Sequence, residues 1–425
     1  ISDIMGKTSE QKAIEAQTDV KIKQITKATA TSDDVAVFET GKIRMIIQEE
    51  EDSTNRAVIP NGFYYVTGAP STGLVISDKF GDDDNNTKGG NQFVWVPCSG
   101  TAGVSYEKEN KLATTWKGKY SERQAKYTEY SDWTDEGGNL ESVRQYGGFY
   151  IARYEAGVPI NASFYVDHSG GEYATNKNPS EEQIIEESEI NLTVEQLKNK
   201  LIPVSKKNTQ CWNEITQEKA EKVSRTMYYN NSYVKSSLVD SYAWDTVVEW
   251  ISKDTSQYSN IATISTPYGN YNNNYNIDAK NTLYAIHRCD ETIFKDRWTY
   301  ATKYLNGEIK SGIEKVDAVT GPEKYEFSQD SYLIGHTYSI VKELATGVSN
   351  VTKTKNIYDL SGNMWEWTTE IGKHNGEPTQ YGVIRAGGFS GSGINYPLSY
   401  RGGDFSTSSY YYFDLGFRVV LYIID

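Results

Sequence analysis

The chain has 425 residues, of which 24% are charged and 37% hydrophobic, and its formal net charge is -14. This length allows one large domain with insertions or two domains. The negative charge argues against nucleic acid or an anionic membrane surface as the main partner. With 9 Trp and 33 Tyr, the chain has enough large side chains for a core, which excludes a disordered protein.

The N-terminal part is predicted to begin with a helix over residues 8–29, because its start fits the capping-box pattern and three isoleucines fall near one face. This helix is either an arm or a surface helix packed on the main body. The chain starts at Ile1 without a Met or an apolar signal region, so we expect an upstream segment to have been removed. Residues 1–57 are therefore expected to be a helix and strands that form a stalk or arm, leading to a missing pilin-like or membrane anchor.

Beyond the first helix, alternating apolar residues predict a series of short strands. They fall at residues 35–38, 43–47, 62–66, 73–76, 92–97 and 147–155. Residues 242–251 predict an amphipathic helix with Trp244 and Ile251 facing inward. Polar stretches at 166–210 and 255–350 are expected to be long connections with short elements. The sum is an α+β domain with few helices and many short strands.

Two local features leave alternatives open. The acidic loop at residues 81–86 either binds a structural calcium ion or is simply solvated, and it lacks the spacing of a calcium-hand loop. Cys211 and Cys289 either form a disulfide or remain buried thiols, and no cysteine pair has metal-ligand spacing.

The C-terminal motifs are the most informative part of the chain. Asn-Ile-Tyr-Asp-Leu-Ser-Gly-Asn-Met-Trp-Glu-Trp-Thr occupies 356–368, Val-Ile-Arg-Ala-Gly-Gly-Phe occupies 383–389, and Gly-Phe-Arg-Val-Val-Leu-Tyr occupies 416–422. Between the last two lies a run of Gly, Ser, Tyr, Phe, Asn and Asp. A rigid frame around small and aromatic residues is typical of binding surfaces such as paratopes. This contrast favours recognition over catalysis.

The order and content of these motifs, together with 149–155 and the Trp244 helix, resemble the formylglycine-generating-enzyme (sulfatase-modifying factor) branch of the C-type lectin fold. The resemblance implies a lectin-like domain over 58–425, with insertions near 160–220 and 255–350.

The motif residues also have structural roles that can be predicted directly. Gly362-Asn363 is a turn pair that tolerates positive φ. Trp365 and Trp367 are expected in the core, with Glu366 facing away from them. Two arginines, Arg385 and Arg418, are expected to pair with Glu366 or Asp359.

Within this branch, the chain most resembles the variable proteins diversified by retroelements, whose mutable positions lie ahead of a Gly-Phe-Arg-like end. The resemblance implies a variable ligand-binding region at 385–418. The residues of the expected type are Phe389, Ser390, Ser392, Asn395, Tyr396, Tyr400, Gly402, Gly403, Asp404, Phe405, Ser408, Tyr410, Tyr411, Tyr412 and Asp414.

The tyrosines at 410–412 provide an independent argument for binding. Three consecutive residues of a strand cannot all face one core, so at least one ring should be exposed. An exposed Tyr offers a large contact area at low entropic cost. The alternative is that these rings pack on the Asn/Tyr-rich stretch at 268–276.

Catalytic interpretations find less support. Copper-dependent formylglycine formation requires a C-terminal cysteine pair, whereas this chain has no Cys after Cys289. The related sulfoxide synthases use clustered histidines, whereas the four His here, at 168, 287, 336 and 374, are scattered. The calcium-dependent sugar site of lectins also lacks a convincing match.

The sequence therefore predicts a non-enzymatic receptor or adhesin that is extracellular, at the cell surface or on a pilus. No cofactor is expected apart from the alternative of a structural calcium ion. The expected partner is a protein or glycan on another cell or on a phage or host surface. The other hypotheses are a metal-dependent oxidoreductase of the formylglycine-generating type and a phage tail receptor-binding protein.

Overall fold

The structure is a computed structural model that describes residues 7–104, 139–159, 164–166, 172–174, 178–186, 188–189, 191–274, 284–289, 299–305, 308–309, 313–317, 324–327, 337–373, 380–410, 412 and 414–424. For the strands between 164 and 174 and between 284 and 342, and for residues 404 and 405, only the backbone is described.

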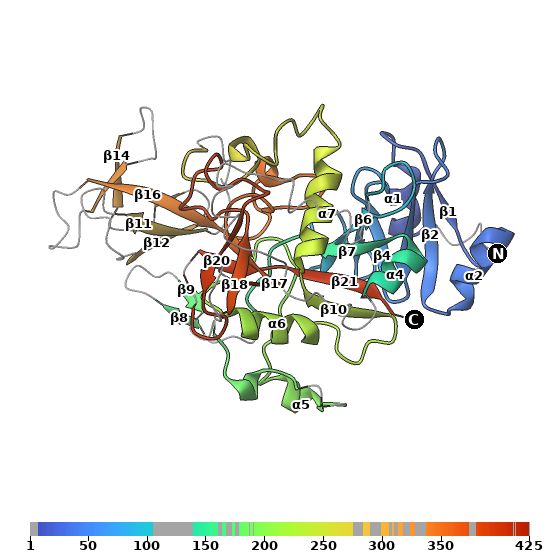
Figure 1. The fold of residues 1–425 in the computed structure, drawn as a ribbon, viewed down its shortest axis with the longest axis horizontal. Coiled ribbons are helices and arrows are strands. Elements are labelled where there is room, and N and C mark those ends of the chain that lie inside the picture. Colours follow the sequence, from blue (N-terminus) through green and yellow to red (C-terminus); the bar gives the residue numbers. More distant parts are fainter. Residues whose placement is uncertain are drawn as a thin grey trace.

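The central element is a six-stranded antiparallel sheet with the order β10-β21-β7-β6-β5-β4 (Figure 1). Its strands are β4 (Tyr64–Thr67), β5 (Val75–Ser77), β6 (Gln92–Pro97), β7 (Gly148–Ala152), β10 (Val234–Leu238) and β21 (Val419–Ile423). The last strand of the chain therefore lies inside the sheet, between two strands from earlier in the sequence.

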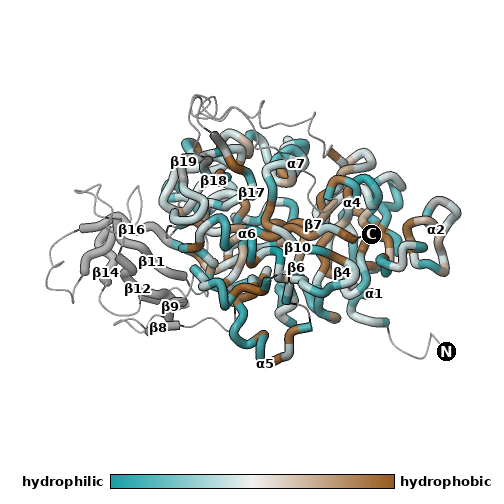
Figure 2. Tube along the Cα trace, turned by 60° about the horizontal axis from the view of Figure 1, so that its bottom comes forward, coloured by the Kyte–Doolittle hydropathy of each residue, from teal (hydrophilic) through white to brown (hydrophobic). Residues whose placement is uncertain are grey.

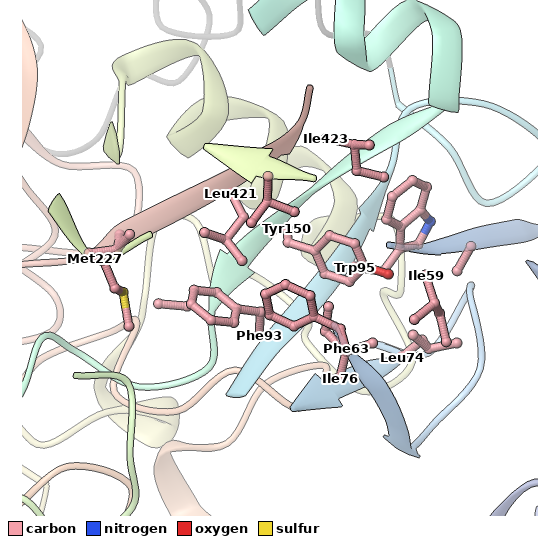
Figure 3. Close-up of a cluster of buried hydrophobic side chains, with 14 of the residues drawn as sticks. Ile59, Phe63, Leu74, Ile76, Phe93, Trp95, Tyr150, Met227, Leu421 and Ile423 are labelled. Atoms are coloured by element: carbon pink, nitrogen blue, oxygen red, sulfur yellow. The ribbon is translucent and has the colours of Figure 1, made fainter. Parts of the chain in front are cut away.

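Both faces of this sheet are buried, because alternate side chains of each strand enter two different cores. On one face, Phe93, Trp95 and Tyr150 pack with residues from the N-terminal part of the chain (Figure 3). On the other face, Val94 and Ile151 pack against helix α7 (Ser241–Ser252). Apolar residues accordingly colour β6 and β7 in the interior, while hydrophilic residues cover much of the surrounding loops (Figure 2).

A second, four-stranded sheet with the order β19-β18-β17-β20 carries the C-terminal motifs. Its strands are β17 (Trp365–Lys373), β18 (Gln380–Arg385), β19 (Arg401–Phe405) and β20 (Leu415–Phe417). Strands β17 and β20 run parallel, with Trp365 opposite Leu415, whereas the other pairs are antiparallel.

The two long insertions also contain strands. β8 (Phe164–Val166) and β9 (Glu172–Ala174) form a hairpin in the first. In the second, a six-stranded sheet has the order β13-β12-β11-β16-β15-β14. Its strands are β11 (Tyr284–Cys289), β12 (Thr299–Leu305), β13 (Glu308–Ile309), β14 (Ile313–Asp317), β15 (Lys324–Phe327) and β16 (Thr337–Leu344). Among the residues of this sheet whose side chains the structure describes, Leu344 at the end of β16 is buried in the main body.

The other helices outside the N-terminal region are short. They are α4 (Asn139–Tyr146), η3 (Glu181–Gln183), α5 (Val194–Leu197), α6 (Gln217–Thr226), η4 (Thr266–Tyr268) and η5 (Asn350–Thr352). None of the helices that the structure describes is both long and apolar enough to cross a lipid bilayer.

The N-terminal region differs from the sequence prediction. It contains α1 (Ser9–Glu15), β1 (Ile22–Ile25), α2 (Ser32–Glu39), β2 (Ile43–Glu49) and β3 (Arg56–Pro60), with the strands in one sheet. The predicted capping box does start a helix, but that helix ends after two turns, and the following isoleucines lie in β1. The strand predicted at 35–38 is helical, because Thr31 and Asp34 form a second capping box.

Helix α1 is also tied to the main body. Its Glu10 carboxylate is buried, accepts two hydrogen bonds from Arg44, and accepts a third from the backbone N–H of Tyr65 at 2.7 Å. Ile14 of the same helix belongs to the main core. The alternatives for this helix were an arm and a surface helix packed on the main body, and the contacts of α1 therefore favour the second.

Replacing Glu10 with Ala should lower the free energy of unfolding by about 1–3 kcal/mol, because it leaves a buried amide and a part-buried guanidinium without their acceptor. Glu15→Ala on the same helix is the matched control. Its carboxylate pairs with Lys7 in solvent, so the expected loss is below about 0.5 kcal/mol. Urea unfolding of both variants tests this, and equal losses would show that α1 is not anchored through Glu10.

Candidate ligand-binding surface

The segment between β18 and β20, residues 386–414, contains all fifteen predicted binding positions. Three buried ion pairs surround its base. They are Arg385 with Asp245, Arg401 with Glu370, and Arg418 with Glu366. Each side chain in these pairs is at most 7% exposed. Removing one partner of such a pair costs about 3–5 kcal/mol, since it leaves a buried charge uncompensated.

Arg418 is the most completely satisfied of these arginines. Its guanidinium makes two-pronged contact with Glu366 and donates to the carbonyls of Ala152 and Tyr358 at 3.1 and 3.0 Å. The predicted pairing of Arg418 with Glu366 is confirmed. For Arg385 the prediction is wrong, because its partner is Asp245 on α7 at 2.7 Å.

The expectation for the two tryptophans holds in part. Trp367 is fully buried and its indole N–H donates to the Ile215 carbonyl at 2.9 Å. Trp365, however, is half-buried. Glu366 does face away from both indoles, but into a second buried region that contains Arg418.

The first half of the segment is held through its main chain. Asn272 donates from its amide side chain to the Ser390 carbonyl at 2.7 Å and from its backbone to the Gly391 carbonyl at 2.9 Å. The Ser265 backbone donates to the Gly393 carbonyl at 2.9 Å, and the Ser265 hydroxyl accepts from the Leu398 amide at 2.7 Å.

Further contacts continue this pattern. The Tyr271 hydroxyl donates to the Tyr396 carbonyl at 3.0 Å, and the Trp244 indole donates to the Leu398 carbonyl at 3.1 Å. Since the partners in the segment are backbone atoms, these bonds do not depend on which side chains the segment carries. The stretch at 268–276 therefore binds residues 390–396, mainly through their backbone, whereas Tyr410 and Tyr412, for which packing on this stretch was the alternative, contact the main core.

The structure distributes the fifteen predicted positions over three environments. Buried positions are Phe389, Tyr400, Gly402, Gly403 and Asp414. Half-buried or exposed positions are Ser390, Ser392, Asn395, Tyr396, Ser408, Tyr410 and Tyr412. Tyr411 and the side chains of Asp404 and Phe405 lie outside the described residues. The second group makes up the described solvent-facing part, which we call the outer positions.

Trp365 extends this surface and was not predicted from the sequence. Its ring lies edge-on to Tyr396 and Tyr400, at centroid distances of 4.7 and 5.3 Å. A Cβ at Gly388 would come within 2.8 Å of the indole, so the backbone passes directly against it. Its alternation with Glu366 places it on the same face as buried Trp367, so no sequence signal distinguished the two indoles.

Tyr410 and Tyr412 are each covered on one side. Their rings stack at 6.3 Å, and Tyr410 also lies edge-on to Trp367 at 6.4 Å. Both contact the main core and both remain half-buried. Asp414, predicted as a charged ligand contact, is instead buried and accepts a hydrogen bond from the Ser390 hydroxyl.

A buried polar cluster lies beneath this surface. The amide of Asn363 donates to Glu155 at 2.6 Å, and the Cys211 sulfur lies 3.2 Å from the same carboxyl oxygen and 3.3 Å from the Leu344 carbonyl. Asn363 has φ 63° after Gly362 at 75°, as predicted for the turn. Its backbone carbonyl accepts from the Phe389 amide, which connects the cluster to the surface.

Burial raises the pKa of Glu155 well above its ordinary value, and the charges of Asp359 and Glu366 raise it further. The carboxyl group accepts hydrogen bonds from the Asn363 amide and the Met364 backbone, and the Cys211 thiol lies within donating distance of it. Burial also raises the pKa of the Cys211 thiol. Cys211 is a free thiol, so of the two alternatives left open for this cysteine the structure contains the buried thiol.

The acidic loop uses its carboxylates internally. Asp82 accepts from Ser77, Asn86 and Gln92, while Asp84 pairs with Arg153. Within the part of the chain that the structure describes, no group of three or more His, Cys, Asp or Glu residues is arranged to hold a metal ion. The four histidine side chains lie outside the described residues.

The C-terminal motifs can now be compared with known families. Residues 299–423 match the family model of the Sulfatase-modifying factor enzyme 1-like domain. The matched region holds all three C-terminal motifs and the whole 386–414 segment, and it supports the resemblance to the formylglycine-generating branch. The predicted span of 58–425 is wider than this match. No curated protein matches the chain.

The main-chain anchoring predicts different costs for identical substitutions. Ser265→Ala removes a buried acceptor and donor, so it should lower the free energy of unfolding by about 1–3 kcal/mol. Ser408→Ala, at an exposed outer position, should change it by less than about 0.5 kcal/mol. Urea unfolding measures both variants, and a large loss at Ser408 would show that its side chain supports the fold.

The raised pKa of Glu155 predicts that the free energy of unfolding depends on pH. Because its pKa is higher in the folded than in the unfolded state, its stabilising contribution is present near pH 4 and is lost as the pH rises toward the folded pKa. Glu155→Gln cannot ionise. The free energy of unfolding of the variant minus that of the wild type should therefore rise with pH, by at most about 1.4 kcal/mol per unit.

Urea unfolding at several pH values between 5 and 8 measures this difference. Its pH dependence is the informative quantity, because Gln also changes the hydrogen bonds at any pH. The surface variant Glu195→Gln serves as control, with an expected difference that does not vary with pH. A constant difference for Glu155→Gln would mean that Glu155 is ionised in the folded protein.

Proposed function

We propose that this chain is a non-enzymatic ligand-binding protein with a C-type lectin-like body of the formylglycine-generating type. Its binding site is the surface of the 386–414 segment, and its side chains there are diversified by a retroelement. The proposal places the protein outside the cell, at the cell surface or on a pilus, with a protein or glycan as ligand.

The main support for the proposal is that the segment is held through its backbone while many of its side chains face solvent. Frame residues such as Ser265 and Asn272 hold the segment by its backbone. The outer positions meanwhile present hydroxyls, an amide and tyrosine rings to solvent. Because the backbone holds the segment, solvent-facing side chains can differ between copies at a lower cost than buried ones, and aromatic and small polar residues suit such a surface to recognition.

The surface chemistry points in the same direction. The 386–414 segment has one basic residue, Arg401, and this residue is buried against Glu370. Recognition at this surface would therefore rest on aromatic contact and neutral hydrogen bonds. Trp365 and Tyr396, both half-buried, are the largest rings available for this contact.

One observation favours a second candidate. The family match at 299–423 also includes the formylglycine-generating enzymes, which implies a metal-dependent oxidoreductase. Copper or iron at one equivalent in protein purified without chelators, together with turnover of a cysteine-containing peptide, would favour the enzyme over the receptor.

A display library tests the proposal directly. Randomising the outer positions Ser390, Ser392, Asn395, Tyr396, Ser408, Tyr410 and Tyr412 should yield folded variants, some of which bind an unrelated probe protein such as lysozyme. The control is a library of equal size at exposed positions of residues 253–263. If most members of the first library fail to fold, or if both libraries give equally few binders, the surface is not a recognition site.

The DNA provides the separate test of diversification. A nearby reverse transcriptase gene and a near-copy of the coding sequence for 385–418, differing only at adenines, are expected. Mismatches spread over all four bases would contradict diversification while leaving the binding role to be judged from the library.

A further inference from the structure

A cluster of positively charged side chains lies outside the 386–414 segment, around the ring of Tyr358. Three cations approach this one ring. The guanidinium carbon of Arg153 is 5.3 Å from the ring centroid, the Lys353 ammonium is 5.9 Å away, and the Lys207 ammonium is 6.0 Å away. The three come from different parts of the chain, so the fold itself assembles them.

The three cations are not equally satisfied. Arg153 is fully buried and its guanidinium donates to the side chains of Gln92 and Asp84 and to backbone carbonyls. Lys207 and Lys353 are half-buried, and neither has a carboxylate within 4.0 Å among the residues that the structure describes. The only hydrogen bond described for the Lys207 ammonium is a long one of 3.5 Å to the Asn85 side chain.

Carboxylates also lie near this cluster, in a protein whose net charge is -14. Asp84 pairs with Arg153, and Asp82, Asp83 and Asp359 act from farther away on the tyrosine rings or on Lys207. Burial lowers the pKa of Lys207, the charges of Arg153 and Lys353 lower it further, and Asp84 and Asp83 oppose this effect. The ammonium groups of Lys207 and Lys353 therefore repel each other, and neither forms an ion pair that would relieve this repulsion among the residues that the structure describes.

We propose that Lys207 and Lys353 form a binding site for a small oxyanion, such as a phosphate or sulfate group, beside the Tyr358 ring. Each ammonium carries three donors on a flexible stem, which suits an anion with several acceptor oxygens. Arg153, which pairs with Asp84, lies against the same ring, and the Tyr154 ring stacks on Tyr358 at a centroid distance of 5.3 Å.

The alternative is that the two lysines serve only as long-range counter-ions for Asp84, which would give no site. The two readings differ in what happens when the lysine charges are removed. A counter-ion role predicts little change in anion binding, whereas a binding site predicts its loss.

Isothermal titration of the full chain with inorganic phosphate, at constant ionic strength in chloride, is the test. The wild type should bind phosphate and sulfate at one site and acetate more weakly, because acetate carries a single charge. Lys207→Gln/Lys353→Gln should weaken phosphate binding at least about tenfold, as expected for the loss of charge-assisted hydrogen bonds.

Lys198→Gln, which removes an exposed lysine on α5, is the matched control and should bind phosphate like the wild type. Far-UV circular dichroism confirms that the variants fold, since both lysines are half-exposed. The proposal fails if the wild type binds no phosphate, or if the double variant binds it as tightly as the wild type. Neither result bears on the 386–414 segment.

Discussion

The contact between Arg418 and Glu366 is the constraint on which the arrangement of the two main sheets depends. Arg418 lies at the residue where the chain leaves β20 in the four-stranded sheet and enters β21 in the six-stranded sheet. Its guanidinium binds Glu366 on β17 and the carbonyl of Ala152 on β7, so one side chain joins both sheets. A buried pair of this kind contributes little net energy but fixes one geometry, because any other geometry leaves a charge unpaired.

The same frame explains how an irregular segment can have a defined position. Residues 386–414 contain one short strand, β19, and otherwise turns and loops, yet Ser265, Tyr271 and Asn272 bind their backbone. Order in this part of the protein thus comes from neighbouring loops and from the paired arginines at its base. The aromatic rings of Trp365 and Tyr396 pack edge-on against each other on this support.

The periodic elements and the turn residues of the motifs could be predicted from the sequence. The partners of several charged side chains could not. Strong alternation located β6 and β7, and the apolar spacing located α7. The N-terminal helix was predicted too long, because a run of polar residues with sparse isoleucines fits a helix face and a strand equally well.

Tertiary contacts account for the errors at the site. Arg385 pairs with Asp245, which is 140 residues away in sequence, and no local sequence pattern indicates such a pairing. Asp414 resembles a ligand contact by residue type, but Ser390 binds it in the interior. The capping boxes at Thr31 and Asp34 and at Thr193 and Gln196 were signals that the sequence contained and that the prediction missed.

The position of β21 has a consequence for how the protein is made. This strand, Val419–Ile423, fills the place between β7 and β10, and it is synthesised long after both of them. Until β21 has been synthesised, β7 and β10 lack the neighbour that joins them, and their edges stay open to other chains. The six-stranded sheet therefore cannot close before residue 423 has left the ribosome, and until then the nascent chain depends on chaperones or rapid elongation to avoid aggregation.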